Sequence, residues 1–297
     1  GYTNATLYNI QSLTVDGTIY LKVSALVDLQ TQDEAFYYDT DTTTLYITFT
    51  EYDTWLEQAI FAGTVVGFSK EADSDGNVYE NNGDQDFWIV KISANGDISW
   101  QKSFGFSGAD TGYAITETND NGFLICASSD SNDFNISNNK GQYDFWIFKI
   151  DANGTLVWEK NFGGSEIEEP RDICKTNDGN FMIVGDTRSN DKDVFKNNGA
   201  ADLWVVKINT DGNLLWEKTF GGSSFDAGRA IFPSLNGGFI IAGNSRSENA
   251  NFSNLGQNDG WILKIDDAGN QIWQQFYGGS ENDFLNDIIE MPDNSII

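Results

Sequence analysis

The chain alternates short apolar runs with polar turns, and no stretch of it shows sustained helical spacing. The clearest case is "AGRAIFPS" (Ala227 to Ser234), "NGG" and "FIIAGNS" (Phe239 to Ser245), followed after a polar loop by "GWILKI", "DDAG" and "NQIWQQFYG". Asn-Gly, Asp-Gly and Gly-Gly pairs supply the positive φ that tight hairpins need. The apolar runs favour Ile, Val, Phe and Trp, which are typical of strands. The pattern predicts four antiparallel strands joined by tight turns.

This four-strand pattern recurs with a period of about 58 residues. The phrase "DFWIFKIDANGTLVWEKNFGG" begins at Asp144, and similar phrases begin at Asp86, Asp202 and Asp259. Two tryptophans mark each copy, at spacings of 58, 58 and 57: Trp88, Trp146, Trp204 and Trp261, then Trp100, Trp158, Trp216 and Trp273. Four-stranded antiparallel units repeated at this length predict an all-β fold, a β-propeller with at least four blades.

The repeat also predicts the domain organisation. Residues 59–297 form the propeller, with blades at about 59–105, 106–163, 164–221 and 222–279 and partial strands over 280–297. Residues 1–58 do not follow the repeat and predict a small β-rich module. The first blade lacks a clear first strand, and "LNDIIEM" near the C-terminus could supply it, because propellers commonly close in this way. Closure of four blades and truncation of a longer propeller, with the chain a fragment, are both left open.

The repeated tryptophans account for eight of the nine in the chain. Burying one indole removes about 150–250 Å² from water, worth roughly 4–6 kcal/mol. In "WIFKI", Trp146 shares strand parity with Phe148 and Ile150, so the three side chains lie on one face. Because a propeller blade is covered on both faces, we interpret the repeated rings as contacts between neighbouring blades rather than as an exposed platform for sugars.

Composition narrows the classes of function. Acidic residues outnumber basic ones 45 to 17, the formal net charge is −28, and there is no histidine. So acidic a chain repels nucleic acid and anionic membranes and attracts cations. The lack of histidine argues against zinc hydrolases and against Ser-His or Cys-His nucleophiles, but not against carboxylate chemistry. Cys126 and Cys174 lie in apolar runs and are interpreted as buried thiols. No run of 18 apolar residues predicts a membrane span.

A polar loop before the third strand of each blade carries side-chain oxygens at alternate positions. In the first blade it reads "EADSDGN", which partly resembles the start of an EF-hand. The candidate calcium ligands are Glu71, Asp73, Asp75 and Asn77. However, Glu replaces the usual first Asp, and Asn82 stands where an EF-hand has its bidentate Glu. The alternative is a set of Asx turns that hydrogen-bond the loop's own backbone. Calcium is the one cofactor that the sequence suggests.

A second set of polar residues precedes the first strand of each blade. The acids are Asp110, Glu168, Asp226 and Asp283, and two blades carry an arginine three residues later, Arg171 and Arg229. If the first strands line the central channel, the acids form a ring at one rim with the arginines beneath, a candidate site for a cation or a basic partner. The alternative is that each acid caps its own loop.

Catalytic residues are not predicted. One enzyme site needs only one set of residues, so it should break the symmetry of the repeat, and no such carboxylate pair stands out. The most crowded acids are Glu166, Glu168 and Glu169 in "GGSEIEEP". We interpret them as a solvated loop.

The phrase "DFWIVKI" followed by an Asn-Gly turn, "W-x-K-x-FGG" and "NDGGF"-like hairpins resembles the tandem propeller repeats of large secreted and cell-surface proteins of Bacteroidetes-type bacteria. The resemblance covers about residues 61–297 and implies scaffolds and adhesin-like modules. The N-terminal "FYYDTDTTTLYITF" is similar to short β segments of bacteriophage tail and baseplate proteins and of some β-helix polysaccharide lyases.

The sequence therefore predicts a non-enzymatic extracellular scaffold or recognition module that binds a protein or glycan on one propeller face. It could belong to a larger polypeptide or particle, with no nucleic-acid partner and no membrane insertion. One alternative is a phage tail or particle appendage in host recognition. Another is a carbohydrate-active hydrolase, which would need a deep pocket with two carboxylates about 5–10 Å apart and unequal pKa values.

Overall fold

A computed structural model describes residues 86–93, 97–132, 139–248 and 255–297, together with six earlier strands as backbone. The strands form five four-stranded antiparallel sheets. The N-terminal sheet has the order β1-β2-β4-β3 and contains β1 (Tyr8–Val15), β2 (Ile19–Ala25), β3 (Phe36–Asp39) and β4 (Thr44–Ile47). In the described part of the chain, no helix has the length and apolar character needed to cross a membrane.

The other four sheets are propeller blades, each built from four consecutive strands in chain order. Blade 1 contains β5 (Ala59–Ala62), β6 (Val65–Ser69), β7 (Phe87–Ile92) and β8 (Ile98–Phe104); blade 2 contains β9 (Asp110–Glu117), β10 (Phe123–Ser129), β11 (Asp144–Ile150) and β12 (Leu156–Phe162). Blade 3 contains β13 (Glu168–Lys175), β14 (Phe181–Thr187), β15 (Asp202–Ile208) and β16 (Leu214–Phe220); blade 4 contains β17 (Asp226–Pro233), β18 (Phe239–Ser245), β19 (Asp259–Ile265) and β20 (Gln271–Tyr277). The predicted all-β propeller architecture is confirmed.

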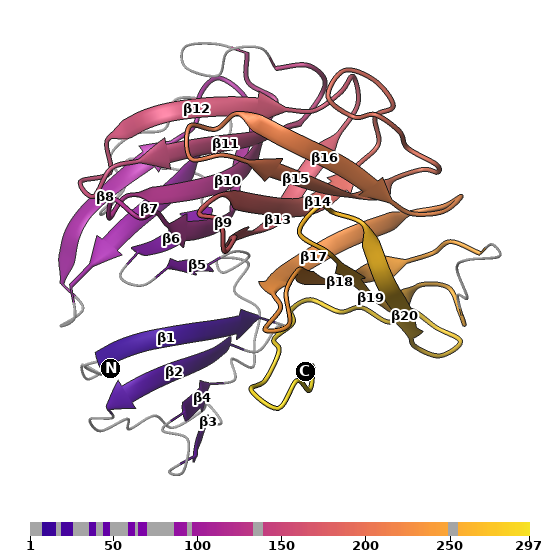
Figure 1. Cartoon of the computed structure of the whole chain (residues 1–297). Coiled ribbons are helices and arrows are strands. Elements are labelled where there is room, and N and C mark those ends of the chain that lie inside the picture. The colour runs from indigo at the N-terminus through magenta and orange to yellow at the C-terminus, as the bar shows by residue number, and fades with distance from the viewer. Residues whose placement is uncertain are drawn as a thin grey trace.

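The blades follow one another around an arc, as Figure 1 shows. The first strands of successive blades, β5, β9, β13 and β17, contact each other along the inner side. The fourth strands β8, β12, β16 and β20 lie at the outer edge of each sheet. This arrangement places the residues of the first strands close to the axis of the arc, where neighbouring blades can contribute to one site.

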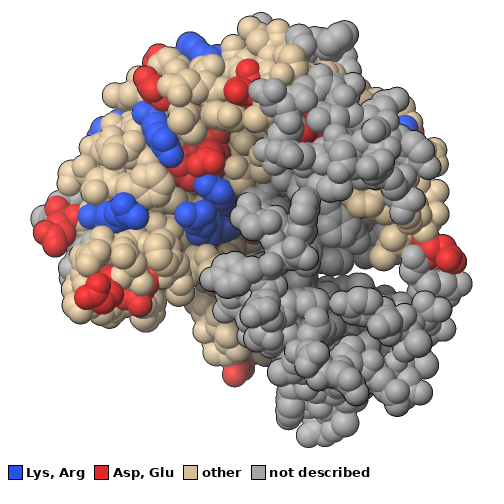
Figure 2. All heavy atoms as spheres, turned by 180° about the vertical axis from the view of Figure 1, so that it is seen from behind, with Lys and Arg blue, Asp and Glu red and all other residues tan. Residues whose placement is uncertain are grey.

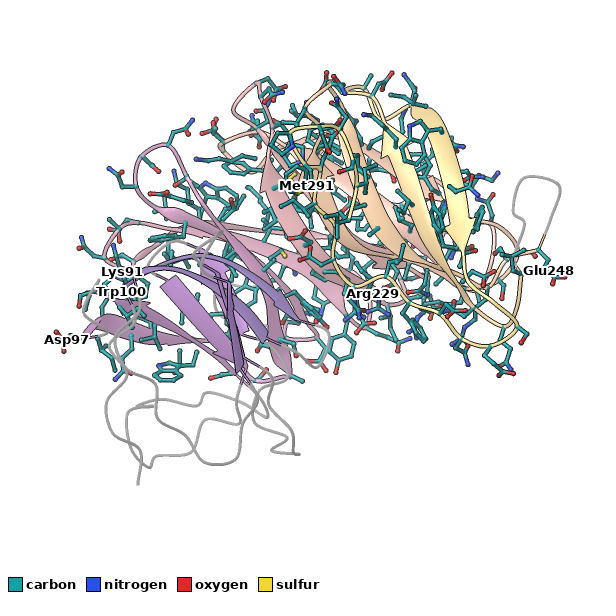
Figure 3. The ribbon with its side chains drawn as sticks, turned by 90° about the horizontal axis from the view of Figure 1, so that it is seen from below. Lys91, Asp97, Trp100, Arg229, Glu248 and Met291 are labelled. Atoms are coloured by element: carbon teal, nitrogen blue, oxygen red, sulfur yellow. The ribbon has the colours of Figure 1, made fainter. Side chains whose placement is uncertain are left out.

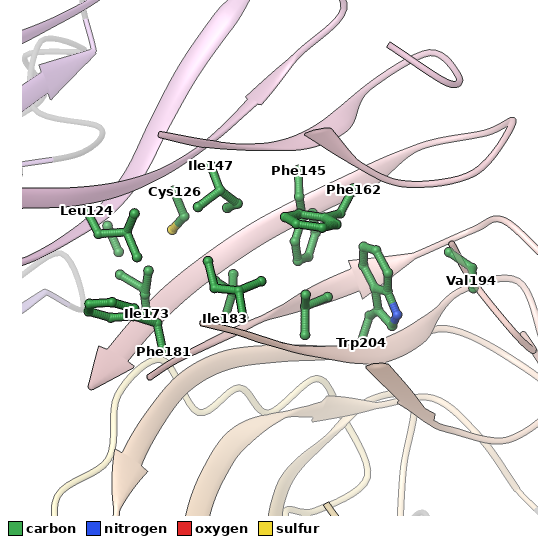
Figure 4. Close-up of a cluster of buried hydrophobic side chains, with 13 residues drawn as sticks. Leu124, Cys126, Phe145, Ile147, Phe162, Ile173, Phe181, Ile183, Val194 and Trp204 are labelled. Atoms are coloured by element: carbon green, nitrogen blue, oxygen red, sulfur yellow. The ribbon is translucent and has the colours of Figure 1, made fainter. Parts of the chain in front are cut away.

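Apolar side chains fill the spaces between blades. One cluster contains residues of blades 2 and 3, and its largest member, Trp204, is fully buried against Phe145 with the ring centroids 4.7 Å apart (Figure 4). Trp146 and Trp261 are also buried, in the clusters that join blades 1 and 2 and blades 3 and 4. In blades 2, 3 and 4 the first repeated tryptophan therefore packs between neighbouring blades, as predicted. Cys126 and Cys174 are buried free thiols, also as predicted.

The second repeated tryptophan packs against the last turn of the next blade. Trp100 Nε1 and Lys91 Nζ of blade 1 both donate to the carbonyl oxygen of Ala152 in blade 2, at 3.0 and 3.2 Å (Figure 3). In the same way Trp158 of blade 2 lies against Gly212, which has a φ of +77°. A Cβ on Gly212 would come within 2.7 Å of the indole of Trp158. The turn glycine is thus required both for its backbone conformation and for this contact.

We expect Gly212→Ala to destabilise the protein by about 1–3 kcal/mol, because alanine is strained at positive φ and its methyl group would displace the indole. Gly237→Ala is the matched control, since Gly237 has a φ of +87° with no atom within 4 Å of its Cβ position. Chemical denaturation of both variants separates the cost of alanine at positive φ from the cost of displacing the indole of Trp158. Equal losses would show that the contact with Trp158 contributes nothing.

The C-terminal segment does not complete the first blade. Ile289 and Ile297 exchange two backbone hydrogen bonds, so the last residues form a small hairpin of their own. Ile288 packs against Ile240 of blade 4. The first strand of blade 1 is instead β5, whose four residues "AIFA" are too few to show a recognisable alternation. The pairing considered for "LNDIIEM" is therefore not what the structure has.

Candidate functional site

The first strands of blades 2, 3 and 4 each contain a β-bulge. The register against the second strand shifts between Gly112 and Ala114 in β9, and at the equivalent points of β13 and β17. The additional, unpaired residues at these shifts are Tyr113, Arg171 and Arg229. A bulge turns a side chain away from the regular alternation of its strand and is frequent beside functional sites. Three blades therefore direct one equivalent residue each toward the axis.

These side chains meet two carboxylates, and we call the group the axial cluster: Tyr113, Glu169, Arg171, Asp186 and Arg229. Arg171 Nη2 donates to Glu169 Oε2 at 3.0 Å, and the Arg171 guanidinium lies over the Tyr113 ring, 4.9 Å from its centroid. The Tyr113 hydroxyl donates to Glu169 Oε1 at 3.3 Å. Strands β9, β13, β14 and β17 thus contribute to a single charged site.

Arg229 brings a second guanidinium to the axial cluster. Its Nε donates to Asn244 Oδ1 at 3.3 Å (Figure 3). Burial lowers the pKa of Arg229, and the positive charge of Arg171 lowers it further. Among the described residues Arg229 makes no ion pair within 4 Å, whereas Arg171 contacts both carboxylates. The guanidinium of Arg229 is therefore the one that is not already paired with a carboxylate.

Asp186 is the most unusual member of the axial cluster. Its side chain is fully buried in β14, and neither carboxyl oxygen has a hydrogen-bond partner in the structure. Arg171 Nε lies 3.8 Å from Oδ1, too far for a hydrogen bond. Burial raises the pKa of Asp186 to about 6, although the positive charge of Arg171 opposes the shift. A buried carboxylate without donors is costly, and such groups are frequent at binding sites.

Asp186 also breaks the symmetry of the repeat. Its counterparts in the other fully described blades are Ser128 and Asn244. Sequence reasoning missed it because "FMIVGDT" reads as an ordinary strand end. It also placed Glu169 in a solvated loop, and this was wrong: Glu169 lies in β13 and binds Arg171, because the strand begins at Glu168.

The axial cluster is half-buried and mixed in charge. The side chains of Arg171 and Glu169 keep 20% and 28% of their surface exposed, so solvent reaches the group. On the face turned away in Figure 1, basic side chains also lie beside acidic ones rather than forming a field of one sign (Figure 2). Two guanidiniums can hold a planar oxyanion, while Glu169 and Asp186 can accept hydrogen bonds. The arrangement therefore suits a ligand that carries both an anionic group and hydrogen-bond donors such as hydroxyl groups.

The acids expected at the rim lie elsewhere. Asp110, Glu168 and Asp226 are fully buried, and each accepts a hydrogen bond of 2.7 Å from the backbone of the loop before it. Asp283 accepts one from Gly279 N at 2.8 Å. These carboxylates hold their loops, which is the alternative that the sequence left open, and the three buried ones are not presented to solvent. Of the proposed rim residues, Arg171 and Arg229 reach the axial cluster.

The loop proposed to bind calcium, with Glu71, Asp73, Asp75 and Asn77, lies outside the described residues. A separate hollow opens between blades 3 and 4, lined by Thr219, Trp261 and Gln274 among others. Its lining contains no ionisable side chain. It therefore offers polar and aromatic contacts but no charge, unlike the axial cluster.

No protein-family model matches the chain. Regulatory protein FlaEY of Caulobacter vibrioides is 22% identical over 164 residues, which are 50% of this chain and 17% of that protein. Among solved structures, a protein of unknown function from Bacteroides caccae is 13% identical with a TM-score of 0.41, covering 95% of this chain and 99% of its own. A subtype N10 neuraminidase-like protein of A/little yellow-shouldered bat/Guatemala/060/2010 is 11% identical with a TM-score of 0.43, covering 94% and 88%.

Proposed function

We propose that the chain is a non-enzymatic recognition module that binds an acidic glycan through the axial cluster. The observation that supports this most directly is the pair of guanidiniums, Arg171 and Arg229, brought by bulges of adjacent blades beside a buried Asp186 with no hydrogen-bond partner. A sugar carboxylate would bridge the two arginines. Sugar hydroxyls would donate to Asp186 and Glu169, and this need for donors favours a glycan over an acidic peptide.

We place this module outside the cell, at a cell surface. The resemblance to propeller repeats of large secreted and cell-surface proteins supports that setting, as does the strongly acidic composition. A rigid arc of sheets that presents a few special residues at its axis is also a common design for recognition. The particle-appendage alternative would use the same binding site and differ in what carries it.

A carbohydrate-active hydrolase is the second candidate, and one observation favours it. Glu169 and Asp186 are paired residues of neighbouring strands beside the same arginine, and burial raises the pKa of Asp186 to about 6. Two carboxylates in different environments are what glycoside hydrolysis requires. Product release from an acidic oligosaccharide would establish this function in place of simple binding.

The test is calorimetric titration with a glucuronate-containing oligosaccharide and with its neutral glucose counterpart. We expect the acidic sugar to bind and the neutral one not to bind. Arg229→Ala should weaken binding at least tenfold, about 1.4 kcal/mol, because it removes the guanidinium that is not already paired with a carboxylate. Lys160→Ala is the control, since Lys160 is an exposed cation on the outer strand β12. Equal binding of both sugars, or an unchanged affinity in Arg229→Ala, would contradict the proposal.

A further inference from the structure

The loop-holding acids have a second partner that recurs at every blade junction. Each lies beside the aspartate at the start of a third strand, and we call these the junction pairs: Asp86–Asp110, Asp144–Glu168, Asp202–Asp226 and Asp259–Asp283. The first three pairs lie between successive blades, and the fourth lies between blade 4 and the C-terminal segment. Of these eight side chains, all except Asp283 are at most 1% exposed. Each blade junction therefore buries two carboxylates side by side, a costly arrangement unless something neutralises it.

The geometry of the junction pairs is the same at each blade. A Cβ placed on Gly221 would lie 2.3 Å from Asp202 Oδ1 and 2.8 Å from Asp226 Oδ2. The corresponding values are 2.3 and 2.6 Å at Gly163, and 2.1 and 2.8 Å at Gly278. The two facing oxygens are therefore at most about 5 Å apart, which one calcium ion can span at about 2.3–2.6 Å from each oxygen. The glycine of the "FGG" phrase keeps this space free of a side chain.

In three of these pairs, the third-strand aspartate has no donor on the oxygen that faces its partner, whereas the facing oxygen of the partner accepts a backbone N–H. Asp202 accepts hydrogen bonds at Oδ2 from the backbone and side-chain nitrogens of Asn198, both at 2.9 Å, but its Oδ1 has no hydrogen-bond partner. Asp144 and Asp259 likewise use Oδ2 for a loop N–H and leave Oδ1 without one. The same atom is thus unsatisfied in three successive pairs, and it lies on the side of the second carboxylate.

We propose that the junction pairs bind divalent cations, calcium by preference, one at each junction between blades. Within the ranges described, no point gathers three or more Asp, Glu, Cys or His side chains. Each ion would therefore be held by two carboxylates and by water, as weak calcium sites are. An ion there neutralises the buried pair, satisfies the free oxygen and ties the third strand of one blade to the first strand of the next. The net charge of −28 favours its capture.

The Asp202–Asp226 pair offers the best test. At the preceding junction, the positive charges of Lys140 and Lys192 lie near Asp144, and they would compete with an ion. Asp202→Asn removes one charge and one ligand oxygen, yet its amide can still accept from Asn198 and donate toward Asp226, so the variant should fold. Asp211→Asn, in an exposed turn, is the charge-matched control.

The experiment measures Tm and bound metal at pH 7.5 with EDTA or with millimolar calcium chloride. We expect calcium to raise the Tm by about 5 °C or more. Asp202→Asn should bind one ion fewer per chain and lose part of the shift, whereas Asp211→Asn should match the wild type. Asp75→Asn separates these sites from the blade 1 loop that the sequence suggested for calcium, because it should leave the junction ions in place. Asp144→Asn provides a second junction if Asp202→Asn does not fold.

Two outcomes would overturn the proposal. The first is a Tm that is the same with calcium and with EDTA, which would mean that each pair shares a proton or a water molecule instead. The second is a calcium effect that Asp202→Asn and Asp144→Asn leave intact and Asp75→Asn abolishes, which would place the ion in the blade 1 loop that contains Asp75. Neither outcome bears on the axial cluster, because sugar binding there is measured separately.

Discussion

Trp204→Ala is expected to destabilise the protein by about 3–5 kcal/mol, the largest effect of any single substitution considered. The indole is fully buried between blades 2 and 3, where it contacts the Phe145 ring at a tilt of 56°, and its Nε1 donates to Glu217 Oε2 at 2.7 Å. The substitution leaves a cavity and removes the donor of a partly buried carboxylate. Because whole domains have free energies of unfolding of about 5–15 kcal/mol, this substitution would remove a large part of the stability of the protein.

Trp273→Ala is the control for this prediction. Trp273 belongs to the same repeat but remains 36% exposed, because none of the described sheets follows blade 4 and covers its outer face. Its removal should cost less than about 1 kcal/mol. Both values come from urea unfolding followed by circular dichroism. If Trp204→Ala does not fold, Trp204→Phe keeps most of the ring and should give an intermediate loss. Equal losses at Trp204 and Trp273 would refute the view that these rings join blades.

The repeat made the fold predictable, and the reason is physical. Strand parity alone placed Trp146, Phe148 and Ile150 on one face, and the structure buries them together in the cluster that joins blades 1 and 2. Turn glycines such as Gly212 were recognisable because only certain residue types adopt positive φ. In contrast, β5 was missed because a four-residue strand shows too little alternation. Local pattern predicts local structure, and repetition of that pattern predicts the architecture.

The axial cluster was only partly predictable. Arg171 and Arg229 stood out because they occupy equivalent positions, but their direction depends on bulges, and a bulge changes hydrogen-bond register without leaving a mark in composition. Asp186 could not be connected to them, since the pairing of β13 with β14 is needed to bring it beside Glu169. The structural role of the rim acids, in contrast, could be predicted. They recur in every blade, and a residue that holds a loop is needed at each loop.

Asp186 links stability to binding through pH. Its folded pKa of about 6 lies above the unfolded value near 3.8, so the folded state binds this proton more tightly. Stability is therefore greatest below about pH 4 for this group and is lost as pH rises through 6. At pH 7.5 the loss amounts to about 3 kcal/mol at most. Asp186→Asn should remove this loss of stability, because asparagine does not ionise. The variant should therefore be more stable than the wild type at pH 7.5 and equal to it near pH 4.

The affinity for an acidic sugar should also fall as pH rises. The charged groups that act on Asp186 are Arg171 and Glu169 from β13, Arg229 from β17, and Arg188 after β14. Protonation of Asp186 leaves the arginines less neutralised, so an acidic sugar should bind the wild type more tightly at pH 5.5 than at pH 7.5. Asp186→Asn should bind with one affinity across this range, and Asp267→Asn, in an exposed turn, should follow the wild type. A pH profile that Asp186→Asn leaves unchanged would show that another group titrates, and that the buried carboxylate is structural.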